Sequence, residues 1–441
     1  MFHKVLTNCF IHSINCSQRV HFLSKQRLLW SSNAGHNAVN TVISRCLSST
    51  PSAVTSHTVV DTFRTNQSDP RLHSTQHLAM YYTIPADIAT KLFVLGGFSG
   101  QQQRAFKTFR ETTLMVRRPA LEVMDYLRRA HYNRPVNRYV LYGPIGSGKT
   151  FTANHVLHYG FEEKFVLLYC PNPTDWVQYP EETSQSSYKG QRMDTPIDAA
   201  VWLQLFRTHN NHLLDELDLR ASKQYVWSQR EITEPGDPLK NILEHGISRI
   251  KHSSDCMAVI LKEIKEQSVS GKYRVLVVVD KANAFYESSK IKYPDRSLVD
   301  IDNITIARAF KKLFTNDWTN GAVVATVDKK LVVPYRIHKV SRPFKAKAKS
   351  RASDNWGPFT VSHISDLPHD LLTNTGFKHF DPFIPIEVPI YDDKEMESCL
   401  NYYNDRKWIQ RPIAKTVEGR NEIKFLSAFN PLETYEICCG L

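Results

Sequence analysis

Arg138 to Thr150 reads RYVLYGPIGSGKT, and this stretch decides the fold. Its first part, Tyr139 to Tyr142, is a short apolar run that predicts a β-strand. The second part has the pattern GxxxxGK[ST], and the following residues, FTANHVLHYGF, predict a helix. A strand, a glycine-rich loop and a helix in this order are typical of a phosphate-binding loop. A chance match to the pattern is the alternative, and the correct neighbours on both sides argue against it.

Each residue type in this loop has a role in binding a nucleotide. Glycines allow backbone N–H groups to point at phosphate oxygens, next to the positive end of the following helix. Lys149 is expected to reach the β and γ phosphates, and the Thr150 hydroxyl is expected to bind Mg²⁺. The predicted nucleotide-binding residues are Gly143, Pro144, Ile145, Gly146, Ser147, Gly148, Lys149, Thr150, Phe151 and, from a second motif, Asp280.

The second motif is RVLVVVD, from Arg274 to Asp280. Its consecutive apolar residues are typical of a parallel strand that is buried on both faces. An Asp at the carboxyl end of such a strand would lie beside the phosphate loop, so Thr150 and Asp280 form the predicted metal site. A core strand that ends in an ordinary surface Asp is the alternative, and the phosphate loop makes it the weaker one.

The residue after Asp280 bears on hydrolysis. Many ATPases place Glu there to polarise the attacking water, whereas this chain has Lys281, which is no general base at neutral pH unless its pKa is strongly depressed. No catalytic residue is assigned, and weak or absent hydrolysis is expected. Asn283 either orients a water molecule or caps a turn, and the sequence favours neither. The NKxD string that reads guanine in Ras-like GTPases is missing, so the motifs leave the base open.

Two more apolar runs, Phe165 to Tyr169 and Ala322 to Val327, alternate with helical stretches. The predicted fold class is α/β: a P-loop NTPase parallel sheet covered by helices, with a large, mainly helical insertion and a C-terminal helical region. Thr326 or Asp328 is expected near the γ-phosphate. The predicted divisions are 1–60 as transit peptide and leader, 61–137 as N-terminal extension and helices, 138–328 as nucleotide-binding domain with its insertion at 174–272, 329–356 as basic arm and 357–441 as mainly helical region.

The net charge of +12, from 56 Lys and Arg against 44 Asp and Glu, is unevenly distributed over the 441 residues. Residues 1–60 carry +5 without any acid and interleave Arg with apolar residues and Ser, which is typical of a mitochondrial transit peptide. A disordered basic tail is the alternative. Residues 329–351 carry +9, so the rest of the chain is nearly neutral. No run approaches the ~18 apolar residues of a membrane span, which excludes a transmembrane segment.

The second basic segment alternates cations with Tyr335, His338 and Phe344, and its prolines disfavour a helix. Such an extended arm suits RNA, because its cations neutralise phosphates while its rings stack on unpaired bases. A solvated loop is the alternative. The predicted RNA-binding residues are Lys329, Lys330, Arg336, Lys339, Arg342, Lys345, Lys347, Lys349 and Arg351.

The eight cysteines carry no metal or disulfide pattern. Three lie in the predicted transit peptide, and the others show neither a CxxC pair nor zinc-finger spacing. A disulfide framework or a zinc site is therefore not expected, and the thiols are predicted to be reduced and mostly buried.

Long and idiosyncratic strings from about residue 80 to the C-terminus resemble one family, the mitochondrial small-subunit ribosomal proteins of the death-associated protein 3 family. The resemblance implies a P-loop NTPase fold related to the AAA+ and STAND groups. The strings are YYTIP from Tyr81, LMVRRPALEVMDYL from Leu114, QSSYKGQRMDTPIDAAVWL from Gln185, YVWSQREITEPGDPL from Tyr225, AVILKEIKEQS from Ala258, NDWTNGAVV from Asn316 and FDPFIPIEVPIYDDKEMESCLNYY from Phe380.

The resemblance implies a structural constituent of the head of the mitochondrial small ribosomal subunit, located in the mitochondrial matrix. It implies bound GTP or GDP with Mg²⁺, with ATP not excluded by the motifs. The implied partners are the small-subunit rRNA, other small-subunit proteins and, through an intersubunit bridge, the large subunit. An active P-loop NTPase switch or adaptor, for example in apoptotic signalling, is the alternative. Pro144 and Ile145 replace charged residues expected in the family, which alters the rim of the loop but neither its glycines nor Lys149.

Overall fold

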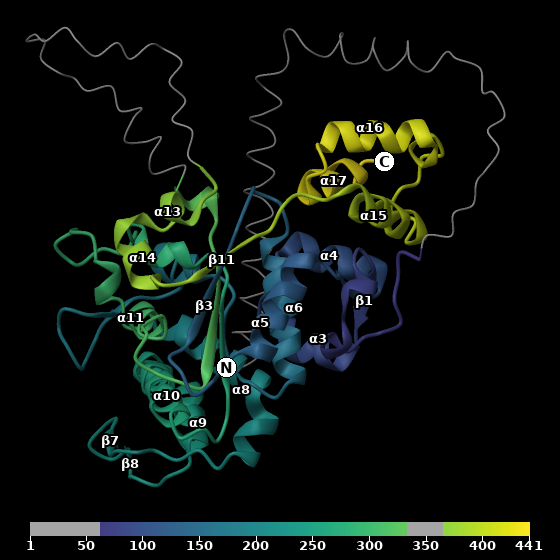
Figure 1. Ribbon diagram of the computed structural model, residues 1–441. Coiled ribbons are helices and arrows are strands. Elements are labelled where there is room, and N and C mark those ends of the chain that lie inside the picture. The colour runs from purple at the N-terminus through teal and green to yellow at the C-terminus, as the bar shows by residue number, and fades with distance from the viewer. Residues whose placement is uncertain (1–61, 333–364) are drawn as a thin grey trace, which may run out of the picture. The chain divides into compact units, whose positions relative to one another are not determined.

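The computed structural model describes residues 62–332 and 365–441. The predicted transit peptide and most of the basic arm lie outside these residues. The centre is a five-stranded parallel sheet in the order β11–β3–β10–β9–β4 (Figure 1), which confirms the predicted α/β fold class. Its strands are β3 Asn137–Tyr142, β4 Val166–Cys170, β9 Val275–Val279, β10 Gly321–Thr326 and β11 Ile384–Glu387.

The strand register places the two nucleotide motifs side by side at the carboxyl ends of the strands. β10 lies between β3 and β9, and Ala325 on β10 pairs with Val140 on one side and Val279 on the other. Every residue of β9 and β10 is buried, as expected for strands covered on both faces. The carboxyl ends of β3, β10 and β9 therefore lie side by side, and the residues that follow them can meet.

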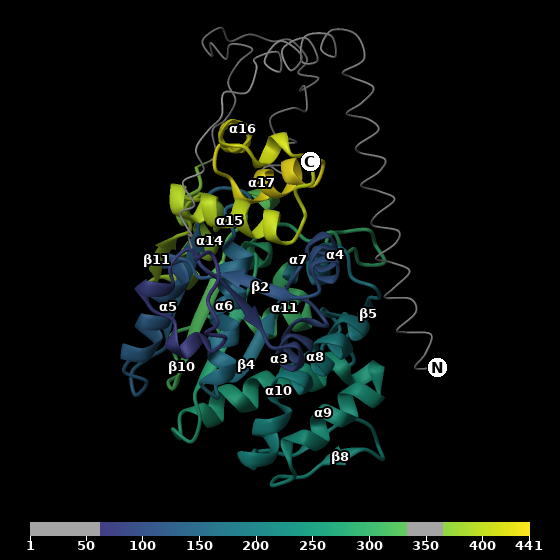
Figure 2. The same ribbon diagram turned by 90° about the vertical axis from the view of Figure 1, so that its right-hand side faces the viewer.

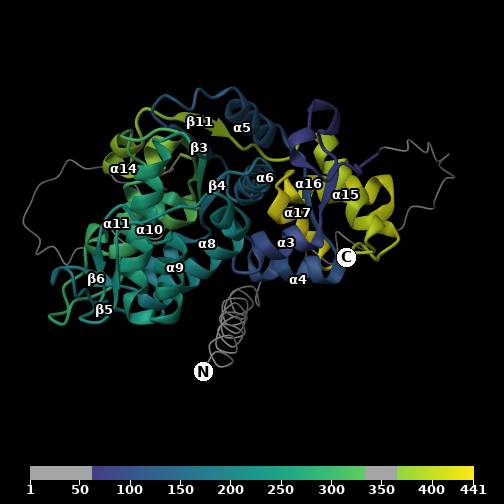
Figure 3. The same cartoon turned by 90° about the horizontal axis from the view of Figure 1, so that it is seen from below.

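Helices cover both faces of the sheet. α5 and α6 lie on one side, whereas α10, α11 and α14 lie on the other (Figures 1 and 3). Within the described ranges, no helix is long and apolar enough to cross a membrane. The helices are α3 Ala86–Phe93, α4 Gly100–Phe109, α5 Arg118–Arg129, α6 Lys149–Glu162, α7 Pro173–Gln178, α8 Pro196–Glu216, α9 Leu239–Ser248, α10 Ser253–Ser268, α11 Thr305–Lys311, α13 Pro368–Leu371, α14 Thr373–Phe380, α15 Asp393–Asp405, α16 Val417–Ser427 and α17 Pro431–Cys438.

The segment 174–272, predicted as a large helical insertion, contributes many residues to the main core. Its helix α8 packs on β4, the outermost strand of the sheet on that side. The Asn210 side chain accepts from Leu167 N at 2.7 Å and donates to Leu167 O at 2.9 Å. Buried Trp202 donates from its indole nitrogen to Tyr169 O at 2.8 Å. These bonds satisfy backbone groups that an edge strand would otherwise leave unpaired.

The N-terminal and C-terminal segments share a second, smaller core. β1 (Tyr81–Ile84) and β2 (Thr112–Met115) form an antiparallel pair that packs with α4 against α15–α17 (Figure 2). The rings of Tyr81 and Tyr402 stack with their centroids 4.3 Å apart, and the Thr113 and Tyr402 hydroxyls are 2.8 Å apart. Residues 63–115 and 391–441, which are distant in sequence, therefore stabilise each other.

Strand β11 comes from the C-terminal segment that the sequence predicts as mainly helical. It pairs with β3, with Ile384 opposite Tyr139. Only Ile386 of its four residues is buried, and Pro385 is tolerated because β11 is an edge strand. The sheet therefore extends beyond the predicted nucleotide-binding domain, 138–328.

Candidate functional site: the phosphate loop

The loop between β3 and α6 adopts a conformation that only glycines can provide at its key positions. Gly143, Gly146 and Gly148 have φ values of 138°, 82° and 99°. A Cβ atom on Gly143 would lie 2.4 Å from the Val388 carbonyl oxygen, and one on Gly146 would lie 2.4 Å from Asn430 Oδ1. Side chains at these two positions are excluded by both backbone conformation and contact.

Donors from outside the loop hold two of its carbonyl groups. Asn430 Nδ2 donates to Ile145 O at 2.7 Å, and Arg117 Nη1 donates to Ser147 O at 2.6 Å. In a planar, trans peptide group the C=O and the N–H point in opposite directions. Because the carbonyls of Ile145 and Ser147 point toward these outer donors, the N–H groups of Gly146 and Gly148 point away from them. Helix α6 also starts without a side-chain cap, so its first N–H groups have no acceptor within the helix. This arrangement of N–H groups suits an anion such as phosphate.

Lys149 lies within the loop, and its ammonium donates to Gly143 O and Pro144 O, both at 2.8 Å. The residue is 8% exposed, and burial lowers the pKa of its ammonium, while the charges of Asp328 and Asp280 oppose that shift. The buried Ser147 hydroxyl has no hydrogen-bond partner among the described residues. A cation within the loop, next to the uncapped N-terminus of α6, fits the phosphates of a nucleotide.

The predicted Mg²⁺ ligands lie next to each other. Thr150 Oγ1 donates to Asp280 Oδ2 at 2.9 Å, and Thr326 Oγ1 donates to Asp280 Oδ1 at 2.6 Å. Burial raises the pKa of Asp280, and the charge of Lys281 and the bonds from both threonines counteract the rise. A carboxylate and a hydroxyl are the hard oxygen ligands that Mg²⁺ prefers, so this donor set fits the ion. Thr326, predicted near the γ-phosphate, bonds to Asp280 of the predicted metal site.

The Asn283 side chain bonds to the backbone of the segment that follows β10. Its side chain donates to Asp328 O at 2.9 Å and accepts from Asp328 N at 3.0 Å, so it fixes the loop after β10. Lys281 follows Asp280 in a left-handed conformation, with φ 58°, and donates from its backbone N–H to Thr326 Oγ1 at 2.8 Å. The residue directly after Asp280 therefore offers no carboxylate to an attacking water.

Two side chains of the site, Arg117 and Asn430, were not predicted from the sequence. Arg117 joins the loop to the second core, because it also pairs with Glu395 at 2.9 Å and donates to Pro389 O at 2.9 Å. Asn430 caps α17 by accepting from Leu432 N at 3.0 Å. Arg117 lies in the family string that begins at Leu114, and Asn430 before Pro431 is a helix-start signal, but neither pattern indicates a contact with the phosphate loop.

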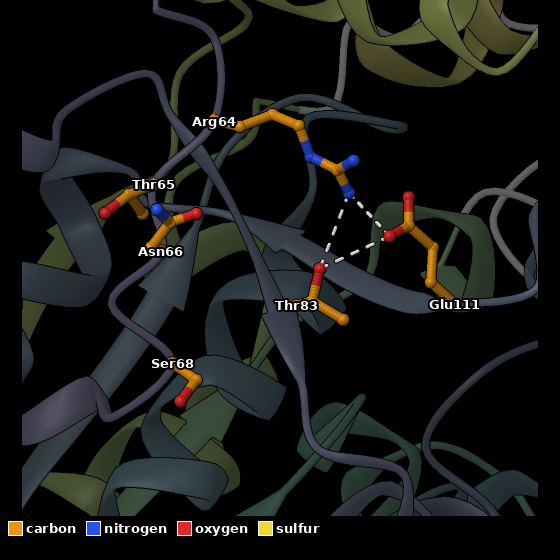
Figure 4. A pocket seen from close by; sticks show the side chains of 6 residues that line it. All are labelled: Arg64, Thr65, Asn66, Ser68, Thr83 and Glu111. Carbon is orange, nitrogen blue, oxygen red and sulfur yellow. Dashed lines mark hydrogen bonds and ion pairs between the residues drawn. The ribbon is translucent and has the colours of Figure 1, made fainter.

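A separate pocket of about 340 Å³ lies beside β1 and β2, and its lining contains no residue of the phosphate loop. Figure 4 shows that Arg64, Thr83 and Glu111 point toward one another across it. Arg64 pairs with Glu111 at 2.5 Å, and Thr83 donates to the same carboxylate at 3.3 Å. Because these charges neutralise each other, we place the candidate site at the phosphate loop instead.

The first residues of the predicted basic arm are described and are helical over residues 329–332. Lys329 Nζ pairs with Asp366 Oδ1 at 3.1 Å, so its charge is balanced within the protein. Lys330 is exposed, and its backbone N–H donates to the Asp328 side chain at 3.0 Å. The other predicted RNA-binding residues, Arg336, Lys339, Arg342, Lys345, Lys347, Lys349 and Arg351, lie outside the described residues.

The sheet and the loop define a P-loop NTPase-like protein. Residues 114–435 match the family described as mitochondrial ribosomal death-associated protein 3, and the chain belongs to this family. The small ribosomal subunit protein mS29 of Mus musculus is 35% identical over 378 residues, which cover 86% of this chain and 89% of that protein. The protein of the same name from Bos taurus is also 35% identical and covers 86% and 88%. The resemblance inferred from the sequence, and the mitochondrial ribosomal localisation with it, are confirmed.

A solved structure of the Aeropyrum pernix ORC2 protein, in ADPNP and ADP complexes, is also similar to this chain. Its TM-score is 0.30 and its sequence identity is 11%. The similarity covers 77% of this chain and 60% of that one.

Proposed function

We propose that this protein is a structural constituent of the mitochondrial small ribosomal subunit, in its head, and that it binds GTP or GDP with Mg²⁺. The observation that carries the nucleotide proposal is the phosphate loop, in which outer donors hold carbonyls while Lys149 lies inside. The ribosomal role is supported by family membership and by two relatives named as small ribosomal subunit proteins. Guanine is proposed from the family, since the motifs leave the base open.

The bound nucleotide would stabilise the fold rather than drive a cycle. Arg117 and Asn430 connect the loop to α15 and α17, so a ligand that orders the loop also favours the docked C-terminal helices. A ligand that binds only the folded state, at a hundred times its Kd, adds about 2.7 kcal/mol of stability. Hydrolysis should be weak or absent, because Lys281 follows Asp280 and Asn283 is engaged with Asp328.

The nucleotide bound to purified small subunits tests this proposal. We expect one guanine nucleotide per copy of the protein in an acid extract resolved by chromatography. A single-turnover assay with GTP and with ATP should then show no hydrolysis that depends on this protein. An adenine nucleotide would overturn the proposed base, and turnover that disappears in a Lys149→Ala subunit would favour the active NTPase switch.

Contacts with rRNA, with neighbouring small-subunit proteins and with the large subunit remain part of the proposal. The acid-free segment 329–351 supports the RNA contact by its charge. Exposed apolar side chains on α16 support a protein contact, because Val417, Phe425 and Leu426 are 63%, 84% and 59% exposed. Apolar side chains that gather on a surface commonly mark an interface.

Replacing Phe425 by Ser should reduce incorporation into the small subunit while leaving the isolated protein equally stable. The ring is 84% exposed, so its removal takes little buried area from the fold. Sucrose-gradient sedimentation of mitochondrial lysates would measure incorporation, and thermal unfolding would measure stability. Leu72→Ser is the matched control, since Leu72 is 60% exposed at a distant position in the sequence. Equal incorporation of the two variants would contradict the α16 interface.

A further inference from the structure

Three potential metal ligands converge on a surface of the helical segment, remote in sequence from the phosphate loop. Glu231, His245 and His252 each offer one ligand atom, and these atoms all lie within 4.8 Å of one another. His245 Nε2 and His252 Nδ1 are 3.0 Å apart, and His252 Nδ1 is 4.0 Å from Glu231 Oε2. The nucleotide proposal uses none of these residues.

The three ligands are held by short, hydrogen-bonded turns. Glu231 lies in the turn between β7 (Tyr225–Val226) and β8 (Ile232–Thr233), where its carbonyl accepts from Trp227 N at 2.9 Å. His245 lies in the last turn of α9 and His252 at the end of the short helix η3 (Ile250–His252). The join between α9 and α10 is fixed because buried Ser253 donates from Oγ to Gly246 O at 2.7 Å. Three chain segments therefore present their side chains to one point.

We propose that Glu231, His245 and His252 form a binding site for a divalent transition metal of the Zn²⁺ class. Two imidazoles and one carboxylate form a donor set that suits Zn²⁺, whose tetrahedral geometry places ligand atoms about 3.3 Å apart. The separations of 3.0 Å and 4.0 Å lie on either side of that value. Coordination would require the two rings and the carboxylate to rotate until their ligand atoms face one ion, because the two ring nitrogens now face each other.

The remaining contacts of the ligands are compatible with coordination. Arg249 Nε donates to Glu231 Oε1 at 3.0 Å, which leaves Oε2 directed toward the rings. Ser228 Oγ, 3.3 Å from the same Oε2, supplies an outer partner to the carboxylate. The proton shared between His245 Nε2 and His252 Nδ1 must move to another ring nitrogen, so that both facing nitrogens present lone pairs. Three protein ligands leave a fourth position for water or for a partner's side chain.

The sequence did not predict this site. The expectation that zinc is absent came from the spacing of the cysteines, and none of the three proposed ligands is a cysteine. Its ligands come from positions 231, 245 and 252, and only the fold of the β7–β8 turn against α9 brings them together. A metal here would fasten that turn to the α9–α10 corner. The site is therefore proposed as a structural clamp on the surface of the helical segment.

Cobalt and zinc titrations of the full-length, tag-free protein test the proposal. We expect one Co²⁺ per chain with the visible absorption of tetrahedral coordination, and we expect stoichiometric Zn²⁺ to displace it. His245→Ala, His252→Ala and Glu231→Gln should each weaken Zn²⁺ binding tenfold to a hundredfold or more, since even outer partners of a metal contribute that much. His212→Ala, which removes an exposed histidine outside the cluster, should bind as the wild type does.

A second readout separates loss of the site from loss of the fold. Far-UV circular dichroism and the metal-free Tm should be unchanged in Glu231→Gln, whereas Zn²⁺ should raise the Tm of the wild type and of His212→Ala more than that of Glu231→Gln. Wild-type binding no tighter than that of the His245→Ala/His252→Ala double variant would overturn the proposal. A cobalt spectrum that survives this double variant would overturn it as well, because the metal would then be bound elsewhere.

Discussion

Replacing Arg117 by Met should lower the free energy of unfolding by about 3–5 kcal/mol, the range found when one partner of a buried ion pair is removed. The Arg117 and Glu395 side chains are 6% and 9% exposed. Both Glu395 oxygens accept from the guanidinium at 2.9 Å, so the substitution leaves a buried carboxylate without its cation. Burial opposes the charge of Arg117, yet its bonds to Glu395 raise the pKa of the guanidinium. Urea unfolding would measure the loss.

Two comparisons make this prediction specific. Arg129→Met makes the same chemical change at an arginine that is 78% exposed and pairs with Asp125, so the free energy of unfolding should hardly change. The double variant Arg117→Met/Glu395→Met removes both charges and should recover part of the loss, because no unpaired charge is left in the interior although the carbonyls that Arg117 holds still lose their donor. A loss in Arg117→Met no larger than in Arg129→Met would show that the buried pair does not stabilise the fold.

The strands and the phosphate loop could be predicted because their signals are local. Tyr139 to Leu141 and Val275 to Val279 are short apolar runs, and every residue in them is buried in the sheet. The glycines between 143 and 148 are required by backbone conformation, which a few neighbouring residues determine. These features depend on little beyond the dozen residues around them, so a single sequence contains them.

Strand β11 and the integration of the segment 174–272 could not be predicted in the same way. Ile384–Glu387 has only four residues with a proline among them, and its strand conformation comes from pairing with β3. Asn210 looks like any polar residue on a helix, yet it satisfies both backbone groups of Leu167. Both features depend on contacts between residues far apart in the sequence, and local amino-acid patterns predict such contacts poorly.

The contacts of Arg117 and Asn430 follow the same rule at the site. Arg117 lies 30 positions from Ser147, and Asn430 lies 285 positions from Ile145. Each side chain donates a hydrogen bond to a carbonyl of the loop, and many other side chains could supply such a donor. Only the docking of the second core on the loop selects these two residues.

Replacing Lys149 by Ala should weaken binding of GTP by two to four orders of magnitude. Each charge-assisted hydrogen bond contributes about 1.5–3 kcal/mol, and Lys149 is expected to make two, one to each terminal phosphate. A loss of about 3–6 kcal/mol corresponds to that change in Kd. Because the ammonium already lies within the loop, bonded to Gly143 O and Pro144 O, it has only to exchange acceptors. Titration of a fluorescent guanine nucleotide in Mg²⁺ would measure the change.

Controls at two positions separate the lysine from the metal and from general charge. Lys164→Ala removes a lysine that is 66% exposed near the end of α6, and the Kd should stay the same. Asp280→Asn should weaken nucleotide binding in the presence of Mg²⁺ more than it weakens binding without the ion. The reason is that Asp280 is expected to hold the metal and not the phosphates. If Lys149→Ala bound the nucleotide as tightly as Lys164→Ala, the loop from Gly143 to Thr150 would not be the phosphate site.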